Sequence, residues 1–135
     1  MKKLLLVGLL VTGLSLAMFS TTPVTLEVAN DVTDWVKLNK ENRIEFNVSV
    51  VSVSTNVVIR PESAFYQATT STYFPVSLVD AATAGGTPDD ITLTATGNYR
   101  FHKDNGISSK FIRLKLVSFS GATPNILVNI TGKRD

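Results

Sequence analysis

The amino-acid sequence predicts an all-β protein: an antiparallel β-sandwich or jelly roll of about eight to nine strands, preceded by an N-terminal hydrophobic helix. From Val24 onward apolar and polar residues alternate with a period of two, which places successive side chains on opposite faces of a strand. Clusters of Gly, Pro, Asn and Asp separate these runs, as turns do between short strands. The 135 residues suffice for one domain with its own core.

The first twenty residues have the layout of a signal peptide or membrane anchor, and residues 21–135 form the predicted β-sandwich domain. A basic start is followed by sixteen residues without a charge, Leu4 to Phe19, which can contact a membrane. Small side chains at Ser15 and Ala17 favour cleavage after Ala17. Retention as an anchor is an alternative, although a helix normally needs about twenty residues to cross the hydrocarbon. Packing of the segment inside an assembly is another.

Two long strands carry the strongest alternation, and each changes phase once. In the strand from Arg43 to Val50, four apolar residues share one face, and the phase slips at Val50-Val51. The strand from Ile112 to Phe119 slips in the same way at Leu116-Val117. A slip of one residue exchanges the two faces, so we expect a β-bulge or a change of sheet at each position.

Shorter strands fill the rest of the predicted sandwich. They are expected at Val24 to Ala29, Trp35 to Leu38, Asn56 to Arg60, Tyr73 to Val79, Asp90 to Thr96, Asn98 to Lys103 and Asn125 to Thr131. Pro75 lacks a backbone donor and therefore places its strand at a sheet edge. Asp104-Asn105-Gly106 predicts a hairpin that joins the strand before it to the strand that starts near Lys110.

Charge and cysteine content exclude several classes of function. Apart from Lys2 and Lys3, eleven basic residues balance eleven acidic ones, so no nucleic-acid partner is expected. The densest basic stretch, Lys110, Arg113 and Lys115, is interpreted as a solvated strand face. The absence of cysteine excludes disulfides and thiolate chemistry.

Candidate catalytic groups are few, and we expect no enzyme, no cofactor and no metal site. His102 is the only histidine, and it is interpreted as a surface residue. The carboxylate pairs Asp31/Asp34 and Asp89/Asp90 can in principle bind calcium or hydrolyse glycosides. Each pair lies in a predicted loop, where aspartates commonly cap turns, and that is the interpretation adopted.

Aromatic residues define the candidate interaction surface. The possible contacts are Trp35, Phe65, Tyr66 and Tyr73, several of which lie in polar surroundings. Exposed rings on a sandwich are typical of carbohydrate-binding modules and of subunit interfaces. Rings that close the ends of the core are the alternative.

The C-terminal part of the chain is similar to the ending of small β-sandwich virion proteins of bacteriophages. The similarity rests on Tyr99-Arg100-Phe101, on the strand from Phe111 to Gly121 with the pattern IRLKLVSFSG, and on a closing strand from Ile126 to Thr131. An upstream tryptophan, Trp35, also fits. The resemblance implies a head-decoration or vertex role in an oligomer, and it carries no catalytic residue.

These observations predict a structural surface protein, most simply a virion component that contacts its own copies and other structural proteins. The alternatives are a secreted filament or adhesin subunit that assembles by β-strand exchange, and a carbohydrate-binding module. The leader predicts a location at the virion surface, or export to the cell envelope or the extracellular space.

Overall fold

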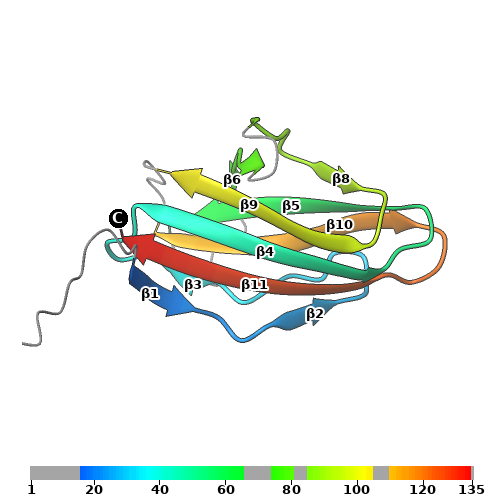
Figure 1. Cartoon of the computed structure of the whole chain (residues 1–135), viewed down its shortest axis with the longest axis horizontal. Coiled ribbons are helices and arrows are strands. Elements are labelled where there is room, and N and C mark those ends of the chain that lie inside the picture. Colours follow the sequence, from blue (N-terminus) through cyan, green and yellow to red (C-terminus); the bar gives the residue numbers. More distant parts are fainter. Residues whose placement is uncertain (1–15, 66–73, 81–84, 105–109, 135) are drawn as a thin grey trace, which may run out of the picture.

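A computed structural model describes residues 16–65, 74–80, 85–104 and 110–134, and these form two antiparallel sheets packed face to face (Figure 1). Sheet A has the order β1-β11-β4-β9-β7, and β2 also pairs with β11. Its strands are β1 (Leu16–Ser20), β2 (Val24–Leu26), β4 (Arg43–Ser52), β7 (Val79–Asp80), β9 (Gly97–Asp104) and β11 (Asn125–Arg134). The predicted all-β class is confirmed.

Sheet B has the order β3-β10-β5-β6, and β8 also pairs with β5. Its strands are β3 (Val36–Lys37), β5 (Asn56–Ala64), β6 (Phe74–Pro75), β8 (Ile91–Leu93) and β10 (Phe111–Ser120). Pro75 lies on the edge strand β6, as its missing donor predicts.

Both predicted phase slips are register shifts in the structure. Ser52 pairs with Asn125 and Val50 with Ile126, so Val51 is an extra residue that is 53% exposed. Along β10, Leu116 pairs with Ile59 and Ser118 with Val58, which leaves Val117 as the extra residue. After this shift Phe119 lies opposite the buried Val57 and packs against the core.

The core lies between the two sheets and consists of the inward residues of the alternating runs. Fully buried side chains include Phe46 and Val48 on β4, Ile130 on β11, and Ile59 and Leu114 on β5 and β10. Burial of an aliphatic side chain of this size contributes roughly 1.5–3 kcal/mol. Because the inward residues of the long strands are apolar and their outward neighbours mostly polar, the alternation selects the core.

The end of the predicted leader is a strand and not a helix. Leu16–Ser20 pairs antiparallel with the last residues of β11, from Leu16 opposite Arg134 to Ser20 opposite Thr131. The expected helix is therefore wrong for these residues, because an extended segment here satisfies the backbone groups of β11 at the sheet edge. The rest of the predicted signal peptide lies outside the described residues. In the described ranges no helix is long and apolar enough to cross a bilayer.

Two predicted connections also differ. The strands on either side of Asp104 and Lys110 do not form a hairpin, because β9 pairs with β4 and β7 in sheet A while β10 pairs with β3 and β5 in sheet B. The single strand expected from Tyr73 to Val79 is divided into β6 and β7, which belong to different sheets. Both segments cross between the layers of the sandwich.

Candidate functional site

Trp35 precedes β3 and is half-buried, and its ring contacts an arginine. The guanidinium carbon of Arg113 lies 4.2 Å from the ring centroid, the geometry of a cation–π contact. The face of the ring that Arg113 covers is therefore not open to a sugar. The predicted role of Trp35 as an interaction surface is left with its remaining exposed part.

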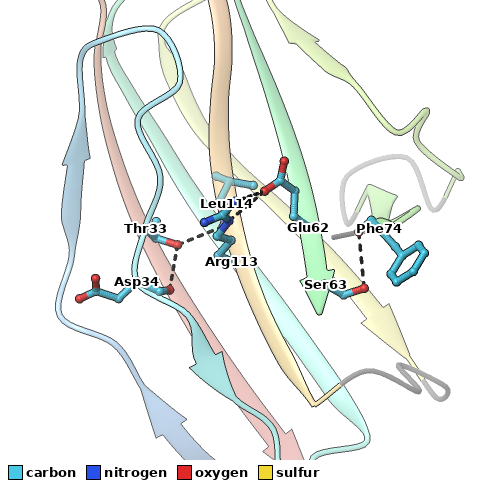
Figure 2. Close-up of polar contacts among 7 residues, drawn as sticks. All are labelled: Thr33, Asp34, Glu62, Ser63, Phe74, Arg113 and Leu114. Carbon is cyan, nitrogen blue, oxygen red and sulfur yellow. Dashed lines mark hydrogen bonds and ion pairs between the residues drawn. The ribbon is translucent and has the colours of Figure 1, made fainter. Parts of the chain in front are cut away.

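Arg113 also forms an ion pair on the outward side of sheet B. Its Nη2 lies 2.8 Å from Oε2 of Glu62, and its Nε donates to the same oxygen over 2.8 Å (Figure 2). Glu62 is fully buried although its residue alternates away from the core. Oε1 of Glu62 has no hydrogen-bond partner. The expectation of a solvated face is wrong for Arg113, since Glu62 and Trp35 cover its guanidinium.

The loop before β3 covers the free edge of β10. Thr33 donates its backbone N–H to the carbonyl of Leu114 over 2.9 Å, and its hydroxyl accepts the N–H of Leu114 over 3.0 Å (Figure 2). Asn30 and Asp31 make the same kind of exchange with Leu116. Because the loop satisfies these backbone groups, this edge of sheet B is closed to strand addition.

An exposed pair of phenylalanine rings lies where β5 ends and β6 begins. Phe65 is 48% exposed and Phe74 is 46% exposed. Their rings meet edge to face with centroids 6.1 Å apart. Of the predicted surface residues, the structure thus places Phe65 in a ring pair, and Phe74 is the partner. Tyr66 and Tyr73 lie outside the described residues.

A cavity of about 500 Å³ lies beside the β1–β2 edge of sheet A; we call it the edge cavity. Its apolar lining comes from both sheets and its rim is polar. The lining includes Phe19, Val24, Trp35, Val36, Val128 and Ile130, and the rim includes Thr22, Asp34, Lys37, Asn39 and Glu41. The sandwich is therefore incompletely filled at this edge.

Phe19 and Gly132 meet next to the edge cavity. The ring of Phe19 occupies the space where a side chain at position 132 would lie, and a Cβ there would overlap it. Gly132 is a buried residue of β11 in the inward phase, so the ring takes the place of a core side chain. The sequence analysis did not identify this contact, and a lone glycine near the end of an apolar strand was its only signal.

The outward face of sheet A is polar. Asn47 donates its amide to Oδ1 of Asn129 over 3.4 Å, and the amide of Asn129 donates to Oγ of Ser20 over 3.1 Å. Glu45 binds Lys133 over 2.8 Å and Arg43 over 3.2 Å. These acidic and basic groups neutralise one another, which agrees with the absence of a basic patch.

The predicted titratable residues have structural partners. The carboxylate of Asp31 accepts the N–H groups of Glu27 and Val28, and these bonds hold the pKa of Asp31 below its ordinary value. The hydrogen bond from Arg60 lowers the pKa of Asp90. Nε2 of His102 lies 3.3 Å from the carboxylate of Asp104 on the outward face of sheet A. In the described ranges no group of three His, Asp or Glu side chains is arranged to hold a metal ion.

Comparison with known proteins identifies the fold. No protein-family model matches the chain. No curated protein matches its sequence either. Among solved structures, the crystal structure of the SPBc2 prophage-derived protein YomS is similar, with a TM-score of 0.57 and 11% sequence identity. The similar region covers 84% of this chain and 96% of YomS. The chain therefore has a fold that is also found in a prophage-derived protein.

Proposed function

We propose that this chain is a non-enzymatic structural protein of a virion surface, a decoration or vertex component that acts by associating with its own copies and with other structural proteins. The observation that carries the proposal is the fold shared with a prophage-derived protein over most of both chains. The resemblance of the strand from Phe111 to Gly121 to phage virion proteins supports the same class.

The surface of the sandwich supports an assembly role. A pair of aromatic rings that are each nearly half exposed is costly to leave in water, and aromatic residues are enriched at subunit interfaces. The charged groups of the outward face of sheet A are paired with one another, so an interface at the ring pair would depend on apolar burial. Such contacts persist at high salt, whereas surface ion pairs weaken.

Sedimentation velocity over a range of concentrations tests this proposal. The wild-type chain is expected to form an oligomer, and F65S/F74S to shift the oligomer to at least tenfold higher concentration. V28S is the matched control, because Val28 is exposed by 62% in a turn away from the rings. A wild-type chain that stays monomeric at the highest concentration would overturn the assembly role.

A filament or adhesin subunit is the second candidate, because β1 is an edge strand that closes sheet A. Electron microscopy of the assembled protein separates the two: closed rings or shells favour a virion component, and open filaments favour the second candidate. A carbohydrate-binding module has less support, since Arg113 covers one face of the Trp35 ring. Binding of the wild type on a glycan array would revive it.

A further inference from the structure

We propose that β1 is an exchangeable strand, and that in the assembled protein β1 of one copy pairs with β11 of another copy. This inference rests on the proposed function, since it supposes that copies of the chain associate. It goes further by naming the contact: the ring of Phe19 from one copy in the space above Gly132 of the next.

The position of β1 makes exchange simple. β1 and β2 pair with the same strand, β1 with Gly132 and its neighbours and β2 with residues 126–128. Thr21 continues the pairing, because its N–H donates to the carbonyl of Ile130 over 2.9 Å and its hydroxyl accepts the N–H of Ile130 over 2.9 Å. Rotation at Thr22-Pro23, both exposed, would carry β1 and Thr21 away without disturbing β2.

The attachment of β1 to the core relies on few contacts. Among the side chains of residues 19–21, the half-buried ring of Phe19 is the one packed against the core. The edge cavity borders Phe19, Ser20 and Thr21, so part of the space around them is unfilled. An element that is poorly packed in its own copy loses little when it leaves, and it recovers the same contacts in a neighbour.

The occupant is a second copy because the site is built for this sequence. Any copy brings the same strand, the same ring and the same register, whereas an unrelated strand would have to match the space left by Gly132. The chain before β1 adds a reason for exchange between copies. Its residues from Leu4 to Leu16 carry no charge, and such a segment is more stable against a neighbouring subunit than in water.

A cysteine pair distinguishes exchange from pairing within one copy. The chain has no native cysteine, and Ser20 and Thr131 are cross-strand partners. Opposite residues of an antiparallel pair have Cα atoms roughly 4.5–5.5 Å apart, which suits a disulfide. In S20C/T131C, oxidised at a concentration where the wild type is assembled, exchange predicts covalent dimers or longer ladders on a non-reducing gel.

The other outcomes overturn the inference. A disulfide confined to single chains would show that β1 stays in its own copy, and an absence of any disulfide would show that β1 does not pair with β11. If the wild type nevertheless sediments as an oligomer, the proposed assembly role survives and only strand exchange fails. A monomeric wild type would instead overturn both.

A second variant keeps the core filled while it removes the exchanged contact. In F19S/G132V the valine on β11 takes the space of the ring, so the sandwich is expected to remain folded by circular dichroism. Exchange predicts that this variant loses covalent ladders when it is combined with S20C/T131C. Ladders that persist at wild-type yield would show that Phe19 does not hold the exchanged strand.

Discussion

Trp35 lies over the guanidinium of Arg113, which at the same time binds the buried carboxylate of Glu62. The three residues come from the loop before β3, from β10 and from β5, so they connect the covering loop to the two long strands of sheet B. Removal of the ring exposes the ion pair to water and deletes the cation–π contact.

We therefore expect W35A to lower the free energy of unfolding by about 2 kcal/mol, the sum of a lost cation–π contact and lost apolar burial. W35F, which keeps a smaller ring, should lose less. Urea unfolding followed by circular dichroism measures both. Equal losses in the two variants would mean that the ring's contact with Arg113 contributes nothing.

The ion pair of Glu62 and Arg113 should matter far more than the exposed pair of Arg60 and Asp90. E62Q leaves the covered guanidinium without its anion, and breaking a buried pair on one side costs about 3 kcal/mol. D90N breaks a pair whose carboxylate side chain is 43% exposed, and about 0.5 kcal/mol is expected. Thermal unfolding of both variants at pH 7 makes the comparison, and a larger loss in D90N would contradict it.

Asp31 should make stability depend on acidity. Its pKa is lowered in the folded chain by the N–H groups of Glu27 and Val28. The folded state therefore binds the proton more weakly, so the contribution of Asp31 is present above its ordinary pKa of about 3.8 and is lost as the pH falls through the lowered value. D31N should be less stable than the wild type at pH 7, and the difference should shrink by pH 2.

D34N is the matched control for the acid experiment, because the carboxylate of Asp34 accepts no hydrogen bond from the described residues. Denaturant unfolding at pH 7 and pH 2 provides the measurement. A deficit in D31N that is the same at both pH values would show that the capping bonds do not depend on ionisation.

Gly121 should not tolerate a side chain. Its φ of 89° lies in the left-handed region, and a Cβ would meet the side chain of Ser54. G121A is expected to cost about 1–2 kcal/mol. G86A, where a Cβ would find open space, should be neutral. A neutral G121A in urea unfolding would contradict the turn geometry.

Alternation along the chain was sufficient to predict the strands and the side chains that face the core. Phe46 and Leu114 were assigned inward by phase, and both are fully buried. The bulges at Val51 and Val117 were also readable, because a slip in phase is a local property of the sequence. Pairing is not local. Phase says which face a residue occupies but not which strand lies beside it, and this is why β9 and β10 were wrongly joined.

The candidate surfaces were less predictable for the same reason. Arg113 looked solvated because it alternates outward, and only the fold brings Glu62 and Trp35 over it. The contact of Phe19 with Gly132 joins the two ends of the chain, so neither residue alone predicts it. The apolar composition that suggested a leader is shared by a buried edge strand, which explains the error at residues 16–20.

The place of β11 in sheet A constrains how the protein folds during synthesis. The last ten residues of an ordered strand to leave the ribosome lie between β4 on one side and β1 and β2 on the other. Until they emerge, these three earlier strands lack the neighbour that joins them. Folding must then wait for translation to finish, and the long sequence separation of the paired strands makes the final step slow.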